Sequence, residues 1–345
     1  MFAAAVAADR RIGALLVERK ARLGSKVLMT ANGRCNFTRD INADRFLDDL
    51  GFGQRAFLAQ AVRECPPRQV IECLKSLGMS VRRMADGRMF PADGKAASVV
   101  HAFGDLLRDR EVPVITNCAV RAIRRPDPAK PFVIETANFD LAAQNVLIAT
   151  GGVSCPKTGS VGDGQRFAAE FGHRIVPYRP GLIGLETSDS RVTRFAGRRF
   201  EDDGRATIRN SKNQTLFDYK GEVDCEHFGL SGAAIYNAER FLEHFRRDGG
   251  STHDLSLEVW FGHNRVTLQV DALKPRPLKE SIVTIGGVAT DEINPATMES
   301  RLAKGLYFAG EVMDIDGPTG GYNLTLAFAT ARKAVVSAMA SRARR

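Results

Sequence analysis

The sequence predicts an α/β protein in which a β-rich segment interrupts a part built from parallel strands and helices. Two apolar runs, residues 145–152 and 305–311, are short and end in glycines, as buried parallel strands do. Residues 324–340 are rich in Ala and Leu and predict a helix. Residues 181–221 contain no long helical pattern and carry short alternating runs, which predict β structure.

Residues 305–323, GLYFAGEVMDIDGPTGGYN, predict a strand followed by a glycine loop, and the helix comes next. Glycines let a backbone approach a ligand closely, and a helix N-terminus offers unpaired N–H groups and a partial positive charge. This arrangement is typical of phosphate binding. The alternative is an ordinary strand–helix turn with glycines for tight packing.

The same stretch resembles the C-terminal flavin motif of the BaiN (YhiN) family of FAD-dependent oxidoreductases, and the long ordered match favours flavin binding over a packing turn. The resemblance implies that Gly310 and Glu311 hold the ribityl-phosphate part of FAD. It also implies that a loop of five residues borders the flavin ring. These are Thr319, Gly320, Gly321, Tyr322 and Asn323.

The N-terminal residues 1–11 predict a helix, and residues 13–17 predict a buried parallel strand that stops at Glu18. An acid at this position binds the ribose hydroxyls of adenosine in a Rossmann fold. The glycine fingerprint G-x-G-x-x-G should precede the first helix, but the chain begins inside that helix. The resemblance therefore implies that the first strand and its phosphate loop are missing. We expect the real start to lie upstream; a truncated, non-catalytic remnant is the alternative.

Residues 19–42 resemble the family segment that ends in a GGGRCNxTN loop. The matching residues are Lys26, Asn32, Gly33, Arg34, Cys35, Asn36 and Thr38. Asn32 stands where many relatives have Gly, and Arg39 where they have Asn. Backbone N–H groups, an amide and a guanidinium suit a phosphate or the polar edge of a flavin. We expect Cys35 to pack or touch the ring rather than act as a nucleophile, since no His accompanies it. A basic surface loop is the alternative.

Residues 44–77 predict at least two amphipathic helices, and the Asp-Gly of residues 84–91 predicts a hairpin. The resemblance implies that Arg88 and Phe90 in this hairpin border the substrate. It also implies that backbone near Val120 meets adenine. In the A-T-G-G ending of residues 145–152, Thr150, Gly151 and Gly152 would pass close to the cofactor.

The β-rich segment contains EHFGLSG at residues 226–232, before a predicted helix that starts near Ala233. It resembles the family element T-H-x-G-L-S-G-P. His227 is a predicted proton donor or substrate contact, although a single His is more often structural. The resemblance implies a longer helical insertion in the region of residues 253–277, and its shortening here puts any lid that it provided in doubt.

Composition narrows the class of protein. Six cysteines without a Cys-x-x-Cys pair predict neither a zinc site nor a redox dithiol, and we expect no metal. The sequence contains no apolar run long enough to span a membrane and no apparent signal peptide, so we expect a cytoplasmic protein. The net charge of +9 and pI near 9.4 fit either a solvated basic surface, which we favour, or RNA binding.

The sequence thus predicts a Rossmann-like FAD-binding domain of the glutathione-reductase type, with its first strand missing, in residues 1–178 and 279–345. A β-rich substrate domain is inserted at residues 179–278. We expect an FAD-dependent oxidoreductase that uses NAD(P)H and a small organic substrate. The predicted catalytic residues are His227, Tyr322 and Arg88. An RNA-associated flavoprotein is the second hypothesis. The sequence does not indicate the substrate or the oligomeric state.

Overall fold

The computed structural model describes residues 1–342, and its chain forms two compact units. The first unit contains residues 1–152, 156–177 and the chain from 286 onward; the second contains residues 153–155 and 178–285. The chain passes between the units along β10 (Ile175–Gly181) and β20 (Val283–Val288), which pair with each other.

The second crossing lies later than the predicted domain boundary after residue 278. Residues 278–285 stay with the β-rich unit because they are bonded to it. The Ile282 N–H donates to the Leu182 carbonyl at 3.4 Å, and the Ser281 carbonyl accepts from the Cys155 thiol at 3.3 Å. Residues 278–285 therefore belong to the inserted unit.

Two pairs of parallel strands form the nucleotide-fold part of the first unit. β1 (Leu16–Val17) pairs with β5 (Val114–Ile115), and β9 (Val146–Ile148) pairs with β23 (Leu306–Phe308). Within residues 1–342, β5 is the one strand that pairs with β1, and β9 is the edge strand of the sheet β21-β22-β23-β9. The predicted strand at residues 13–17 is therefore shortened to its last two residues.

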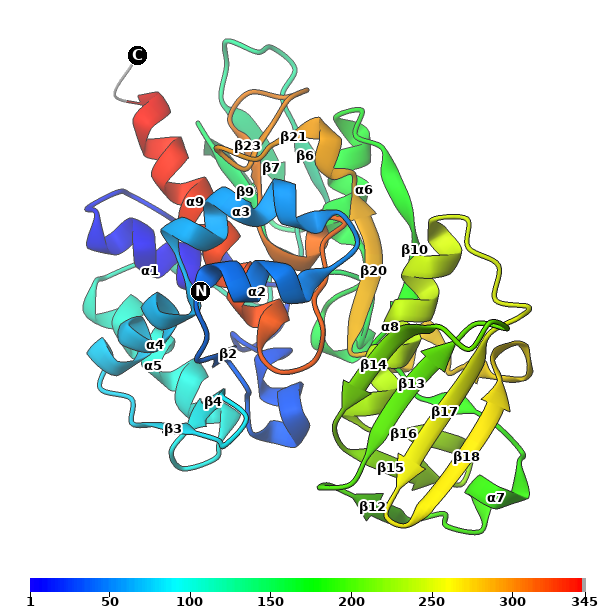
Figure 1. Ribbon diagram of the computed structural model, residues 1–345. Helices are drawn as coiled ribbons and strands as arrows, with labels where there is room; N and C mark the ends of the chain where they lie inside the picture. Colours follow the sequence, from blue (N-terminus) through cyan, green and yellow to red (C-terminus); the bar gives the residue numbers. More distant parts are fainter. Residues whose placement is uncertain (343–345) are drawn as a thin grey trace. The chain divides into compact units, whose positions relative to one another are not determined.

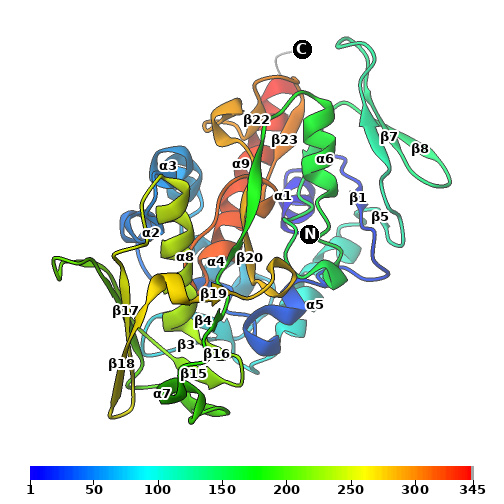
Figure 2. The same ribbon diagram turned by 90° about the vertical axis from the view of Figure 1, so that its right-hand side faces the viewer.

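Helix α9 (Tyr322–Arg342) is the central element of the first unit. Leu326, Phe328 and Ala329 on it are buried, and α1 (Phe2–Asp9) and α3 (Gln54–Glu64) pack against it (Figure 1). Figure 2 shows α1 and α3 on either side of α9. A helix that is apolar on several sides must be enclosed in this way, because each exposed leucine would forfeit about 1.5–3 kcal/mol.

The other helices of the first unit begin at recognisable sequence signals. The Asn42 side chain caps α2 by accepting from the Arg45 N–H at 2.8 Å, and Pro67 opens α4 at the position where proline is tolerated. The remaining helical elements are α2 (Ala43–Leu50), α4 (Pro67–Ser76), α5 (Ala96–Asp109), α6 (Asp163–Glu170), η1 (Val27–Gly33), η2 (Pro156–Thr158), η5 (Thr290–Glu292) and η6 (Gly310–Val312).

Small antiparallel sheets complete the first unit, and the hairpin predicted around residues 84–91 is formed by β3 and β4. One sheet has the order β2-β4-β3, and a second runs β6-β7-β8. Their strands are β2 (Thr38–Arg39), β3 (Val81–Arg83), β4 (Arg88–Pro91), β6 (Ala122–Arg124), β7 (Phe132–Glu135) and β8 (Asp140–Ala143), with β21 (Ile293–Asn294) and β22 (Glu299–Ser300) beside β23.

The second unit is β-rich, and α8 (Ala233–Arg247) begins at the predicted residue. Its four-stranded sheet has the order β14-β13-β17-β18, seen in Figure 1, and its five-stranded sheet the order β12-β15-β16-β11-β19. The elements are α7 (Ser190–Thr193), β11 (Leu185–Glu186), β12 (Arg198–Phe200), β13 (Arg205–Arg209), β14 (Thr215–Lys220), β15 (Val223–Glu226), β16 (Gly229–Ser231), β17 (Ser256–Phe261), β18 (Asn264–Gln269), β19 (Lys274–Pro275), η3 (Val270–Ala272) and η4 (Leu278–Glu280).

Each unit has its own apolar core, as independent folding units do. In the second unit, Leu257 and Val259 of β17 are buried and alternate with the less buried Ser256 and Glu258, so this strand buries one face. None of the helices within residues 1–342 combines the length and the hydropathy that crossing a bilayer requires.

Candidate cofactor site

Glu18 lies where two parallel strands end. It follows β1 directly, and its N–H donates to the Ile115 carbonyl of β5 at 2.8 Å. One carboxylate oxygen accepts from the Lys20 N–H at 2.8 Å. The Glu18 carbonyl accepts from the Cys118 N–H at 3.0 Å, so the predicted adenine-contacting backbone near Val120 begins beside the predicted ribose acid. A nucleotide bound at the carboxyl ends of strands meets these groups together.

Lys26 and Glu311 form an ion pair that joins two predicted cofactor segments. The Lys26 Nζ lies 2.7 Å from the Glu311 carboxylate, with side-chain exposures of 27% and 17%. Lys26 precedes η1, whereas Glu311 lies in η6, just after β23. Sequence positions 285 residues apart are thus held side by side.

The loop of residues 319–323 packs directly on β2. A Cβ added to Gly321 would lie 2.5 Å from the carbonyl carbon of Thr38, and Gly321 has φ +94°, so both space and conformation require glycine here. The Thr38 and Thr325 hydroxyls are 2.7 Å apart, and that of Thr325 also donates to the Gly321 carbonyl at 2.8 Å. The strand that follows the Arg34–Asn36 segment and the loop of residues 319–323 are therefore in contact.

The side chains of Tyr322 and Asn323 hold this loop in place. The Tyr322 hydroxyl donates to Asp49 at 2.6 Å, and its ring stacks on Phe46 with centroids 4.8 Å apart. The Asn323 amide bonds both the N–H and the carbonyl of Gly317 at 2.9 Å. Tyr322 is buried, so its observed role is to anchor the loop to α2, and its predicted catalytic role stays a prediction.

The A-T-G-G segment follows β9 and is covered by the start of α6. A Cβ added to Gly164 would collide with the Thr150 hydroxyl, and one added to Gly151 would lie 3.1 Å from the Ser160 hydroxyl. The Gln165 amide donates to the Gly151 carbonyl at 3.1 Å. The Thr150 side chain stays exposed at the end of the strand. Small residues thus bring the α6 N-terminus close to the predicted cofactor backbone.

Contacts between these segments close into a ring. The Arg19 guanidinium pairs with Asp163 of α6 at 2.6 Å, and a Cβ added to Gly159 would lie 3.2 Å from the Lys20 side chain. We call residues 18–20, 24–36, 149–152, 156–164 and 310–323 the loop ring. All of these segments belong to the first unit.

The chemistry of the loop ring fits FAD. One acid sits at a strand end for ribose hydroxyls, and glycines with positive φ at Gly310, Gly320 and Gly321 allow close backbone approach. The N–H groups at the start of the long helix α9 face the loop that it follows, which suits the electron-rich edge of a flavin.

Cys35 is fully buried, and burial raises its thiol pKa to about 11. A thiol with this pKa is protonated at neutral pH and is a poor nucleophile, which fits the predicted packing role. Its neighbours are also engaged: the Arg34 Nε donates to the Ala31 carbonyl at 3.2 Å, and the Asn36 amide, oriented by its partners, donates to the Thr38 carbonyl at 2.9 Å. Gly33 ends η1 with φ +82°.

The other predicted catalytic residues lie in different units. Arg88 is on β4 of the first unit and pairs with Asp86 at 2.6 Å. Its guanidinium carbon lies 6.0 Å from the centre of the Phe90 ring. His227 lies in the second unit, exposed in the turn between β15 and β16.

Sequence reasoning missed the polar braces behind the loops. Gln54 of α3 bonds Asp316 twice, through its amide nitrogen at 2.9 Å and its amide oxygen at 3.1 Å, and both side chains are buried. Thr38 with Thr325 and Arg19 with Asp163 are similar long-range pairs. No local pattern marks such pairs, since each partner alone is an ordinary polar residue.

Comparison with known proteins agrees with this geometry. The family described as HI0933-like protein Rossmann domain matches residues 1–337. The chain belongs to this family. It is an FAD-dependent oxidoreductase family, and the chain has the predicted Rossmann-like FAD-binding fold.

Relatives with curated names cover nearly the whole chain. A 3-dehydro-bile acid delta(4,6)-reductase from Clostridium scindens is 27% identical over 95% of this chain and 93% of its own length. A ribosomal RNA dihydrouridine synthase from Escherichia coli is 24% identical over 96% and 93%. An enzyme of the same name from Haemophilus influenzae is 23% identical over 98% and 95%.

Solved structures share the fold at low identity. The chain is similar to a 3-ketosteroid delta1-dehydrogenase from Sterolibacterium denitrificans, with a TM-score of 0.59 and 12% identity over 99% of this chain and 97% of that one. It is also similar to the E. coli quinol fumarate reductase FrdA, with a TM-score of 0.58 and 16% identity over 99% and 68%.

Proposed function

We propose that this protein reduces a carbon–carbon double bond conjugated to a carbonyl in a small organic substrate, with NAD(P)H as the reductant. The observation that carries the proposal is the loop ring, in which Glu18, the Lys26–Glu311 pair and the loop of residues 319–323 belong to one connected set of contacts. FAD, when bound there, supplies the hydride. The name of the C. scindens relative describes a reductase of unsaturated bile acids, which supports the bond type.

The chain's own residues orient the cofactor in this proposal. Glu18 accepts hydrogen bonds from the ribose hydroxyls, and Gly310 with Glu311 holds the ribityl part of FAD. Lys26 offsets the Glu311 charge beside a ligand that carries phosphates. The N–H groups at the start of α9 stabilise negative charge on the flavin ring, because a helix N-terminus carries a partial positive charge.

Reduction of a conjugated double bond also consumes a proton. Tyr322 is poorly suited to deliver it, since its hydroxyl is buried and donates to Asp49. Arg88 is held by Asp86 and supplies positive charge rather than a proton. We keep His227 as the proposed donor, because imidazole is the side chain that exchanges protons most readily near neutral pH.

Anaerobic mixing tests this function in two halves. The purified protein, loaded with FAD, is mixed with NADH or NADPH, and bleaching of the flavin absorbance is recorded. A 3-oxo-4-ene steroid is then added, and we expect the absorbance to return as the saturated ketone forms. Bleaching that only oxygen reverses would contradict the proposed substrate class.

A second candidate is the reduction of uridine in RNA, which saturates a double bond conjugated to a carbonyl as well. Two relatives are named ribosomal RNA dihydrouridine synthase, and the net charge of +9 favours a polyanion. Incubation of the NADPH-reduced protein with ribosomal RNA, followed by nucleoside mass spectrometry, tests it. Dihydrouridine in the digest supports this candidate; its absence, together with steroid turnover, favours the first.

A further inference from the structure

We propose that Arg39, flanked by Arg34 and Arg88, binds an anionic group of the substrate, a carboxylate or a phosphate. This inference rests on the proposed function, because it assigns the substrate of that same site a negative charge. It names a residue, Arg39, that the cofactor analysis does not use.

Two of the three arginines face each other across a strand pair. In the register of β2 and β4, Arg39 lies opposite Arg88. The glycine loop lies against both: a Cβ added to Gly320 would lie 3.0 Å from an Arg39 terminal nitrogen and 3.9 Å from the Arg88 Cγ. Because Gly320 has no side chain, the Arg39 guanidinium can lie directly against this loop.

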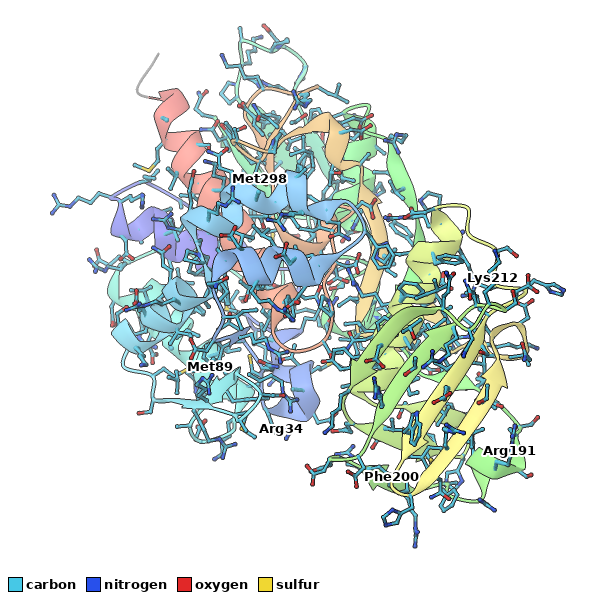
Figure 3. All side chains as sticks on the ribbon, viewed as in Figure 1. Arg34, Met89, Arg191, Phe200, Lys212 and Met298 are labelled. Atoms are coloured by element: carbon cyan, nitrogen blue, oxygen red, sulfur yellow. The ribbon has the colours of Figure 1, made fainter. Side chains whose placement is uncertain are left out.

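The third arginine reaches the same place through Phe90. The guanidinium carbons of Arg34 and Arg88 lie 5.7 and 6.0 Å from the centre of the Phe90 ring. Figure 3 labels Arg34 at the lower edge of the first unit. Arg88 therefore shares the Phe90 ring with Arg34 and the glycine loop with Arg39.

The charges in this cluster are not balanced by the protein. Like charges opposite each other on paired strands are unfavourable. The Asp86 carboxylate offsets the charge of Arg88, with which it pairs at 2.6 Å. Arg39 donates only to the Asp86 backbone carbonyl, at 2.8 Å. The described part of the chain places no carboxylate within ion-pair distance of Arg34 or Arg39.

A bound anion would supply the missing negative charge. A guanidinium presents five N–H donors in a fixed fork that matches a carboxylate or a phosphate. Arg39 uses one nitrogen on Asp86, and Arg34 uses its Nε on the Ala31 carbonyl, so terminal donors remain on both. The cluster thus has the charge and the donors for one bidentate anion.

The position of Arg39 favours a substrate group over a cofactor group. Arg39 on β2 and Arg88 on β4 lie outside the loop ring that the cofactor proposal uses.

Arginine labelling tests the site without any turnover. The FAD-loaded protein is treated with phenylglyoxal, with and without millimolar inorganic phosphate, and labelling is read by mass spectrometry. Arg82, exposed on β3 of the same sheet, is the matched control. We expect phosphate to protect Arg39 and Arg34 at least threefold more than Arg82. Equal protection of all three, or protection of Arg39 by FAD alone, would overturn the proposal.

Turnover then identifies the source of the anion. R39Q and R82Q are compared on a 3-oxo-4-ene steroid acid, on its methyl ester and on a uridine-containing oligonucleotide. A carboxylate ligand predicts a KM about tenfold higher for R39Q with the acid, an unchanged kcat and no effect with the ester. A phosphate ligand predicts instead a salt slope for RNA binding lower by about 1. If R39Q and R82Q behave alike in every arm, the proposal is wrong. Failure of the proposed function appears separately, as absent bleaching by NAD(P)H in both variants.

Discussion

At the scale of single residues, the Lys26–Glu311 pair is the contact that ties the η1 segment to the end of β23. Both side chains are partly exposed, so the pair contributes only about 0–1 kcal/mol to folding. Its larger effect should be on ligand binding. Without the ammonium group, the Glu311 carboxylate would lie uncompensated beside the phosphates of FAD.

We therefore predict that K26M weakens FAD binding about tenfold, or about 1.4 kcal/mol, with little change in thermal stability. K75M on α4 is the control, since Lys75 is an exposed lysine outside the loop ring. Fluorescence titration of apoprotein with FAD measures both. Equal FAD affinities of K26M and K75M would show that the ion pair does not support the cofactor.

At the scale of elements, the packing of the glycine loop on β2 can be separated from its backbone conformation. Gly321 and Gly78 both have positive φ, so alanine strains either backbone by about 1 kcal/mol. Only at Gly321 would the new Cβ meet another backbone, that of Thr38; around Gly78 the space is open.

We predict that G321A lowers the free energy of unfolding by about 2 kcal/mol more than G78A, because β2 and the loop must move apart. FAD affinity should fall in G321A alone. Chemical denaturation and FAD titration of the two variants check this. Equal losses would mean that the loop does not rest on β2 in solution.

A buried histidine links α6 to the β21–β22 hairpin. The His173 side chain has no exposed area; its Nε2 lies 2.7 Å from the Ser300 hydroxyl and its Nδ1 3.2 Å from Glu292. The Ser300 oxygen already accepts from two backbone N–H groups, so its proton points to Nε2 and Nδ1–H donates to Glu292. Burial lowers the pKa of His173 below its usual 6.5, and Glu292 opposes this shift only in part.

This shift fixes the sign of a pH effect. Below pH 6.5 the unfolded chain takes up a proton at His173 that the folded chain refuses, so stability falls as the pH drops from 6.5 toward the lowered folded pKa. We predict that H173Q lowers stability at pH 8 by about 1–3 kcal/mol but flattens the loss between pH 7 and pH 5. H101Q, at an exposed histidine, should keep the wild-type profile. A wild-type slope in H173Q would contradict this assignment.

The elements show how far the sequence could be interpreted. The helices α1, α8 and α9 are predicted from periodicity and small-residue content, and the strand ends at Glu18 and Gly310 from glycines and acids. The 3₁₀ segment η1 was not predicted, because it turns at Ala31 and Asn32 with positive φ, where local propensity favours no such conformation. The short strand β2 is defined only by its partner β4.

For the site, motifs predicted which residues gather but not what holds them. The motif predicts Tyr322 and Asn323 beside the flavin, but it does not indicate that their side chains hold the loop through Asp49 and Gly317. The Gln54–Asp316 and Thr38–Thr325 contacts were missed, because partners more than 260 positions apart leave no mark in either local pattern.

At the scale of the whole molecule, the first unit is assembled from three separate pieces of chain, and the loop ring takes residues from all of them. Residues 18–36, 149–152, 156–164 and 310–323 lie close together although the main part of the β-rich unit, residues 178–285, is inserted between the second and the third piece. A single bound FAD molecule should therefore contact all of these segments at once.

Hydrogen–deuterium exchange with and without FAD measures this directly. We predict that FAD slows exchange together in residues 18–20, 24–36, 149–152, 156–164 and 310–323, while exchange in the sheet β14-β13-β17-β18 is unchanged. Protection confined to one of these segments, or absent from all of them at saturating FAD, would contradict the claim that the loop ring is a flavin site.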